Sequence, residues 1–269
     1  MFINLKKMNK YIKTLLYFIG IILIFGTFFY FINNKNNSID NKEVEIINEN
    51  IIEEVKDFNE VDSVKLEREE REAKNVSEEK ILEKILIQVP FTVQAPFAIW
   101  DEYHEEACEE ASLIMVAYFL KNKKLNPEIS EQEIQALIKF QIESYGDYRD
   151  SSAKELVKLA KDFYGIKNLE AVYDFSQEDL KKYLSQGNPI IIPVAGRLLG
   201  NPYFKAPGPL YHNLVLVGYN GDRIITNDPG TKRGEKYSYD AGVLYRAIHD
   251  FTGKKENIEK GRKAIIIVK

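Results

Sequence analysis

Few residues of this 269-residue chain can act as a nucleophile or a base, because it contains one cysteine, Cys108, and three histidines. A single thiol cannot form a disulfide within the chain, so Cys108 is either an inert core residue or a free thiol retained for its reactivity. It lies where a predicted helix begins, and the free N–H groups and dipole of a helix start favour a thiolate. Cys108 is therefore a candidate nucleophile.

Four glutamates flank Cys108, and their charges oppose thiolate formation. They are Glu105, Glu106, Glu109 and Glu110, and like-charge repulsion from each would raise the pKa of the thiol. Helix geometry predicts that Glu109 and Glu110 point away from the cysteine side. A positively charged partner is still needed, and an imidazolium can supply it.

His212 is the histidine best placed to be this partner. It begins the predicted strand YHNLVLVGYN, where a short strand can aim an imidazole into a cleft, although an ordinary structural role in the strand is the alternative. His104 lies four residues before Cys108 and is expected at the surface or at the rim of a cleft. His249 has no evident acid–base context.

Asp228, in the segment NDPG, is the candidate to orient His212 by accepting the proton on its Nδ1 atom. A strict two-residue turn would place Asp228 opposite Asn213, on the wrong face of the hairpin. A three-residue loop over 220–222 places it opposite Leu214 and diagonal to His212 on the same face, and we favour that register. The alternative for Asp228 is a simple turn-forming role before proline.

Gln94, in the loop VPFTVQAP upstream of the cysteine, is a candidate for stabilising an oxyanion. Its side-chain amide and the backbone N–H of Cys108 could together bind the negatively charged oxygen of a tetrahedral intermediate. Taken alone, a glutamine before Ala-Pro carries almost no signal.

Together these segments resemble the C39-like peptidase family of bacterial papain-fold cysteine peptidases. The likeness runs from about Val89 to the C-terminus through VPFTVQAPFAIWDEYHEEACEEASLIM, YHNLVLVGYN and ITNDPGTKRGEKYSY. The resemblance implies that Gln94 is the oxyanion residue, Cys108 the nucleophile, His212 the base and Asp228 the orienting acid. It implies hydrolysis of a peptide or amide bond through a thioester, without a cofactor.

The resemblance does not imply that this chain cleaves bacteriocin leaders after a double glycine. The relatives that do so are fused to export transporters, and this sequence predicts no more than one membrane span. Two alternatives to a protein peptidase therefore stay open: a peptidoglycan amidase or endopeptidase with the same chemistry, and a non-catalytic papain-like binding module. Lys232 and Arg233 could bind an acidic group of the substrate, although a solvated loop explains them equally well.

The elements that must position these residues change from helices to strands along the chain. Capping signals and apolar periodicity predict helices first and strands afterwards. This order is typical of an α+β protein with a mostly antiparallel sheet, here a papain-like fold. The predicted helices cover 108–120, 130 to about 142, 152 to 165 and 176 to about 186; the predicted strands cover 190–194, 210–219, 223–227 and 264–268.

The N-terminal part predicts a single-pass membrane anchor over residues 11–32, YIKTLLYFIGIILIFGTFFYFI. This run is long enough to cross a bilayer as a helix, and lysines before it would keep residues 1–10 in the cytoplasm. A cleaved signal peptide is the alternative, but no small-residue cleavage site follows. We expect residues 33–84 to form a charged stalk and residues 85–269 to form the extracytoplasmic peptidase domain.

The charge of the chain bears on its partners. A net charge of −4 gives no electrostatic footprint for nucleic acid. One cysteine and scattered histidines lack the spacing of a metal site. The expected partners are a peptide or protein substrate and the membrane.

Overall fold

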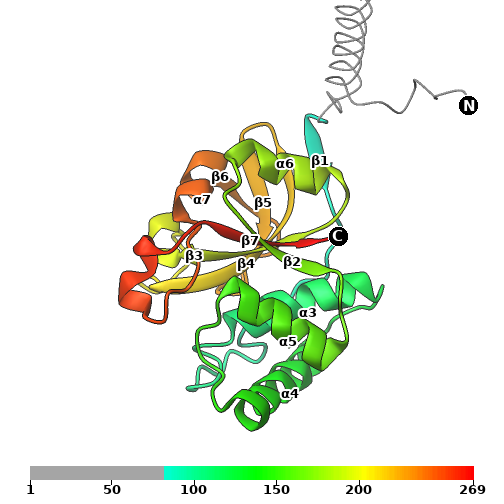
Figure 1. Ribbon diagram of the computed structural model, residues 1–269, viewed down its shortest axis with the longest axis vertical. Helices are drawn as coiled ribbons and strands as arrows, with labels where there is room; N and C mark the ends of the chain where they lie inside the picture. The colour runs from blue at the N-terminus through cyan, green and yellow to red at the C-terminus, as the bar shows by residue number, and fades with distance from the viewer. Residues whose placement is uncertain (1–81) are drawn as a thin grey trace, which may run out of the picture. The chain divides into compact units, whose positions relative to one another are not determined.

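An antiparallel sheet preceded by a group of helices forms residues 82–269, the part of the chain that the computed structural model describes (Figure 1). The seven strands follow the order β2-β7-β3-β4-β5-β6, with β1 paired to β4, and every pairing is antiparallel. The predicted α+β class with an antiparallel sheet is confirmed. The strands are β1 (Lys84–Leu86), β2 (Leu169–Tyr173), β3 (Ile190–Ala195), β4 (Tyr211–Asn220), β5 (Arg223–Asn227), β6 (Tyr237–Asp240) and β7 (Ala264–Val268).

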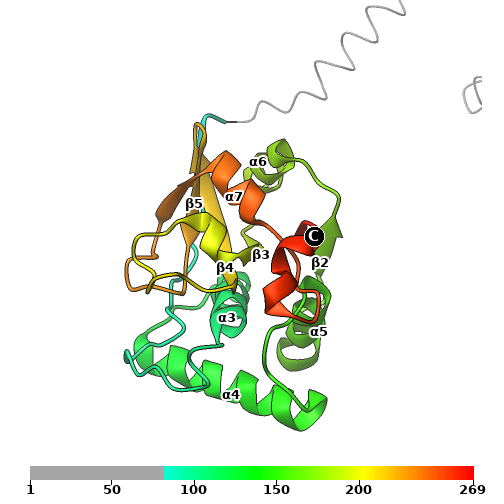
Figure 2. The ribbon, with the colours of Figure 1, turned by 90° about the vertical axis from the view of Figure 1, so that its left-hand side faces the viewer.

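Three of the helices come before β2 and lie together on one side of the sheet, in the lower part of Figures 1 and 2. Among them, α3 packs against β4 and α5 packs against β2. The shorter helices follow among the strands. The helices are α3 (Cys108–Leu120), α4 (Pro127–Tyr145), α5 (Ala153–Tyr164), α6 (Gln177–Ser185) and α7 (Ala241–Ala247), with 3-10 turns η2 (Gly196–Leu199) and η3 (Lys255–Lys260).

Helix α3 is enclosed by the core on all sides. Every residue from Cys108 to Tyr118 is buried, including Glu109 and Glu110. A helix that is largely apolar all round is typical of such a central position. The prediction that both glutamates point away from the cysteine is wrong for Glu109, because its carboxylate accepts a hydrogen bond from the Cys108 thiol at 2.9 Å.

Local capping chemistry sets the bounds of the other helices. Ser152 and Ser176 precede α5 and α6, where helix starts were predicted, and both residues form capping boxes. The second helix begins earlier than predicted, because Asn126 caps it and Pro127 occupies its first position. Ser130 is therefore buried inside α4 and does not start it.

The hairpin of β4 and β5 determines where Asp228 lies. Asn220 pairs with Arg223, so the turn has two residues, and the predicted three-residue loop is wrong. A β-bulge between Leu216 and Gly218 then shifts the register by one residue, so that Val215 pairs with Asn227. Continued by one residue, this register puts Asp228 beside Leu214, as expected, although a bulge and not a longer loop is the cause.

The predicted anchor over 11–32 and nearly all of the predicted stalk lie outside the described residues. Within residues 82–269, no helix is both long enough and apolar enough to cross a membrane.

Candidate active site

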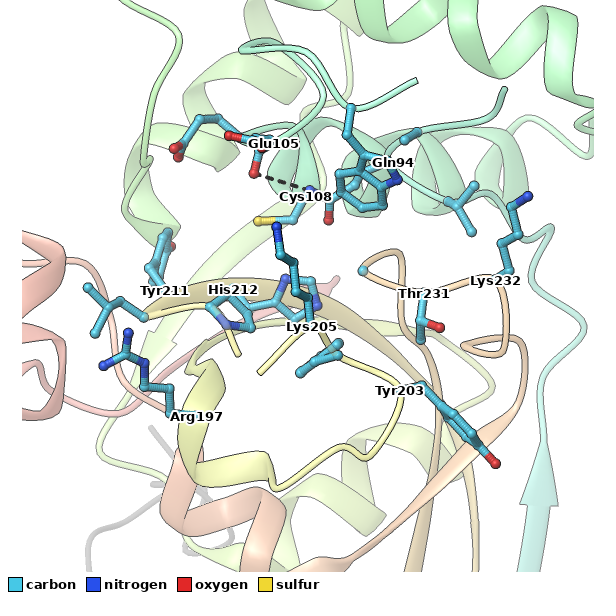
Figure 3. Close-up of a pocket in the computed structure, with 18 of the residues that line it drawn as sticks. Gln94, Glu105, Cys108, Arg197, Tyr203, Lys205, Tyr211, His212, Thr231 and Lys232 are labelled. Atoms are coloured by element: carbon cyan, nitrogen blue, oxygen red, sulfur yellow. Dashed lines mark hydrogen bonds between the residues drawn. The ribbon is translucent and has the colours of Figure 1, made fainter. Parts of the chain in front are cut away.

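A cleft of about 880 Å³ opens between the segment that leads into α3 and the ends of β4 and β5 (Figure 3). Gln94 and Cys108 line one wall, and His212 lines the other. Asp228 is fully buried behind His212. The fold thus gathers around one cleft the four residues that lie far apart in the sequence.

His212 and Asp228 form a buried pair. The Nε2 atom of His212 lies 2.8 Å from Oδ1 of Asp228, and both side chains are almost completely excluded from solvent. The predicted contact through Nδ1 is therefore wrong, and Nε2 is the nitrogen that donates to the carboxylate. Nδ1 is left as the second ring nitrogen, which is the one available to accept a proton.

Several donors surround the carboxylate of Asp228. Tyr239 donates its hydroxyl to Oδ2 at 2.7 Å, Asn201 donates Nδ2 to Oδ2 at 3.2 Å, and the backbone N–H of Gly230 donates to Oδ1 at 3.0 Å. Burial opposes ionisation, but the charge of His212 and these hydrogen bonds outweigh it, so the pKa of Asp228 is lowered. Asp228 is thus held as a fixed anion behind the imidazole.

The His212 ring is also fixed by close packing. Phe204 meets it edge to face, with ring centroids 5.3 Å apart. Gly230 approaches from another side, and a Cβ atom there would lie 2.9 Å from Cε1 of His212. A side chain at position 230 would therefore displace the imidazole, which explains the glycine in the NDPG segment.

Cys108 begins α3 and is 6% exposed. Burial, followed by the charge of Glu109, raises the pKa of the thiol well above its ordinary value. Glu109 also accepts a hydrogen bond from the backbone N–H of Ser151 at 3.0 Å. Burial and the nearby charge of Glu110 raise the pKa of Glu109 to about 8. The raised pKa favours the protonated form of Glu109, which directly contacts the candidate nucleophile.

Gln94 lies beside Cys108 in Figure 3. Its Nε2 atom donates to the carbonyl oxygen of His104 at 2.8 Å and to that of Glu105 at 3.3 Å. Its backbone N–H donates to the carbonyl of Pro229 at 3.0 Å, which joins the two walls of the cleft. The hydrogen bond to Glu105 is the longer and weaker of the two. This bond would have to break before the Gln94 amide could donate the same hydrogen to an oxyanion.

His104 is a buried residue, which corrects the prediction of a surface or rim position. It is 4% exposed and lies between Asp101, at 2.7 Å, and Glu131, at 3.0 Å. Burial alone would lower the pKa of His104, but hydrogen bonds to both carboxylates outweigh it and raise the pKa. Its role is to brace the loop whose carbonyls hold Gln94. The His249 ring contacts the backbone, with Nδ1 donating to the carbonyl oxygen of Gly261 at 2.8 Å.

Two of the groups around Asp228, Asn201 and Tyr239, were not predicted. Tyr239 ends the segment ITNDPGTKRGEKYSY and Asn201 precedes β4, but neither segment indicates a contact to Asp228, because these contacts depend on the tertiary fold. Over residues 82–269, no group of three or more His, Cys, Asp or Glu side chains is arranged to hold a metal ion.

The arrangement contains the parts that a thiol-dependent hydrolase requires: a cysteine, a histidine and an orienting carboxylate. A model of the Peptidase_C39 like family matches residues 86–254. The chain belongs to the Peptidase_C39 like family, and this membership supports the activity of a cysteine peptidase.

Two solved structures are similar to this chain, each over 68% of its length. One is from Bacillus anthracis and is described as a C39-like peptidase; it is 18% identical, covered over 97% of its length, with a TM-score of 0.44. The other is a double glycine motif protease from an AMS/PCAT transporter in complex with the leader peptide; it is 22% identical, covered over 91% of its length, with a TM-score of 0.33. A comparison with curated proteins finds no match.

Proposed function

We propose that the chain is a membrane-anchored extracytoplasmic cysteine peptidase, with Cys108 as nucleophile, His212 as base, Asp228 as orienting acid and Gln94 as oxyanion donor. The observation that carries this proposal is the buried His212–Asp228 pair, 2.8 Å apart, in the same cleft as the chain's single cysteine. A buried carboxylate that fixes a histidine opposite a thiol is the arrangement that proton transfer to and from a nucleophile needs.

The proton movements follow from the ring nitrogens. Nε2 of His212 stays bonded to Asp228, and Nδ1 takes the thiol proton of Cys108. The thiolate attacks the carbonyl carbon of the substrate, and the resulting oxyanion accepts hydrogen bonds from the N–H of Cys108 and from Gln94. Nδ1 then returns its proton to the leaving amine, which leaves a thioester. Nδ1 next removes a proton from water, the hydroxide attacks the thioester, and the proton goes back to the departing sulfur.

Glu109 sets a condition on this mechanism. The resting thiol donates to the Glu109 carboxylate and not to His212. An ionised Glu109 would oppose the thiolate by repulsion, whereas a protonated Glu109 can donate a hydrogen bond to it. The proposed active form therefore has a neutral Glu109, a thiolate at Cys108 and an imidazolium at His212, and it exists below the pKa of Glu109, about 8.

The activity can be tested with the full chain in detergent micelles. Wild type and Cys108→Ser would be incubated with a mixture of unstructured peptides, and the products identified by mass spectrometry. The proposal predicts new peptide termini with wild type only. Cleavage of purified peptidoglycan without cleavage of any peptide would support the amidase alternative, and binding without turnover of either would indicate the binding module.

The membrane attachment rests on the apolar run over 11–32 and the lysines that precede it. It predicts that the protein sediments with membranes at high salt and is released by detergent only. Protease added to intact spheroplasts should remove the domain over 85–269 and leave a short protected fragment. A domain that stays protected until lysis would contradict the proposed orientation.

A further inference from the structure

The two walls of the cleft carry opposite charges. The wall on the α3 side carries Glu105 and Glu106. The wall on the His212 side carries four cations, which come from η2, the loop before β4 and the loop after β5: Arg197, Lys205, Lys232 and Arg233. In Figure 3, Glu105 lies above Cys108, and Arg197 and Lys205 lie on the side of His212. This concentration of positive charge occurs in a chain whose net charge is −4.

Neutral groups hold the two arginines of this wall. Nε of Arg197 donates to the carbonyl oxygen of Gly208 at 3.3 Å. The guanidinium of Arg233 lies over the ring of Tyr203, 4.8 Å from its centroid. A backbone carbonyl and an aromatic ring orient a guanidinium without cancelling its charge. Both arginines are therefore positioned while their positive charge is still available to a ligand.

None of the four cations forms an ion pair within the described part of the chain. By contrast Lys255, which also lines the cleft, is paired with Glu106 at 2.9 Å and with Asp150 at 3.3 Å. Lys255 thus neutralises part of the acidic wall, whereas the cations of the opposite wall have no acidic side chain within 4.0 Å over residues 82–269. An uncompensated positive surface in a cleft attracts anionic groups.

We propose that the cleft selects acidic peptides, with glutamate or aspartate side chains of the substrate bound by the wall of Arg197, Lys205, Lys232 and Arg233. This inference rests on the proposed peptidase function and names its substrate class. A uniformly charged polyanion fits less well, because its charge would also meet Glu105 on the opposite wall. A peptide can place its carboxylates on one side and its backbone at Cys108.

The first test uses small thiol reagents of different charge. Cys108 is the only cysteine, so iodoacetate (anionic) and iodoacetamide (neutral) both report on this site. Both reagents react with the same thiolate, so the ratio of their alkylation rates does not depend on the thiolate fraction. The ratio depends instead on the electrostatic potential at Cys108. Removing two cations in Arg197→Gln/Lys205→Gln should lower the ratio about fourfold, since a unit charge at a separation of about 8 Å contributes roughly twofold in water. The matched control Lys124→Gln removes an exposed charge between α3 and α4 and should leave the ratio unchanged.

The second test uses peptides. A peptide containing glutamates should protect Cys108 from iodoacetamide at a concentration at least about fivefold lower than the same peptide with glutamines. Arg233→Gln/Lys232→Gln should remove this preference, and Lys124→Gln should keep it. Equal protection by the two peptides, or an unchanged reagent ratio in the Arg197→Gln/Lys205→Gln protein, overturns the inference.

Failure of this inference and failure of the proposed function give different results. If alkylation by iodoacetamide depends on His212 but neither the reagent ratio nor the peptide preference responds to the cations, only the acidic-peptide inference fails. If alkylation by iodoacetamide is independent of His212, the proposed catalytic function fails, whatever the reagent ratio.

Discussion

The surroundings of Asp228 and those of Cys108 differ in how their charges are compensated. Three donors and the imidazole of His212 satisfy the Asp228 carboxylate, and its pKa is lowered despite complete burial. Around Cys108, burial and two neighbouring carboxyl groups act in the same direction, and the pKa values of the thiol, of Glu109 and of Glu110 are all raised. One Glu110 oxygen has no hydrogen-bond partner among the described residues.

This difference separates two tasks within one site. On the sheet side, Asp228 keeps one protonation state and one geometry, as expected of a group that orients a base. The side on α3 holds groups that share protons near neutral pH, so its state depends on the solution. We expect substitutions on the sheet side to change the rate at every pH, and substitutions near Cys108 to change the pH dependence.

The largest effect should come from Asp228→Ala. It removes the group that orients His212, so kcat should fall at least about a hundredfold at every pH. It also leaves the donors of Tyr239, Asn201 and Gly230 without their acceptor, and the free energy of unfolding should fall by about 3 kcal/mol. Peptide turnover and urea denaturation measure the two effects.

Asp222→Ala is the control for this loss, because Asp222 is 97% exposed in the turn between β4 and β5. It should behave as wild type in both measurements. Turnover by Asp228→Ala within about threefold of wild type would contradict the orienting role of Asp228.

A second substitution, Glu109→Gln, should change the pH profile and not the maximum rate. The proposed mechanism predicts that ionisation of Glu109 near pH 8 returns Cys108 to the thiol form and limits alkylation of wild type above that pH. Gln keeps the size of the side chain and cannot ionise, so alkylation at pH 9 should be about tenfold faster, which corresponds to one pH unit in the thiol pKa. The exposed Glu128→Gln serves as the charge-matched control.

Stability should respond to Glu109 in a definite direction. Its pKa rises from 4.5 in the unfolded chain to about 8 in the folded protein, so the folded state holds the extra proton between these values. The contribution of Glu109 to stability is therefore lost progressively as the pH rises from about 4.5 to about 8. The difference in thermal stability between Glu109→Gln and wild type should therefore change in favour of the variant when the pH is raised from 5 to 8. A difference that is the same at both pH values would contradict a buried, protonated carboxyl group.

The smallest effect is expected for Tyr239→Phe. It removes one of several donors to Asp228 and leaves the rest in place. Unfolding free energy should fall by about 1 kcal/mol and turnover by a few-fold without a shift in the pH profile. Tyr237→Phe, on the same strand, is the matched control. A pH shift in Tyr239→Phe alone would mean that the state of Asp228 is less fixed than the geometry indicates.

Local sequence signals predicted the elements well. Ser152 and Ser176 placed the starts of two helices, and the run of 108–120 gave the bounds of α3. Each of these signals lies within a few residues of the feature that it sets. Strands β1, β2 and β6 and helix α7 were not predicted. The three strands are short segments with mixed side chains, which become strands only through their neighbours in the sheet.

The parts of the site that depend on tertiary contacts were not predictable. The contact of Glu109 with Cys108 depends on the burial of α3 by the rest of the fold, which makes an outward direction unavailable. The placement of Asp228 on the same face as His212 depends on the bulge between Leu216 and Gly218, and the Asn220-Gly221 turn signal does not encode that bulge. Four residues could be chosen from their types and the family resemblance, but not their protonation states.

The most direct test of the account is iodoacetamide alkylation of Cys108 in the full chain, measured from pH 5 to pH 10 for wild type and His212→Ala. The account predicts rapid alkylation of wild type well below pH 8, and its loss in His212→Ala, because the thiolate exists there as a pair with the imidazolium. Alkylation that rises only near the ordinary thiol pKa of about 8.5 or above it, to the same extent in both proteins, would contradict the catalytic pair.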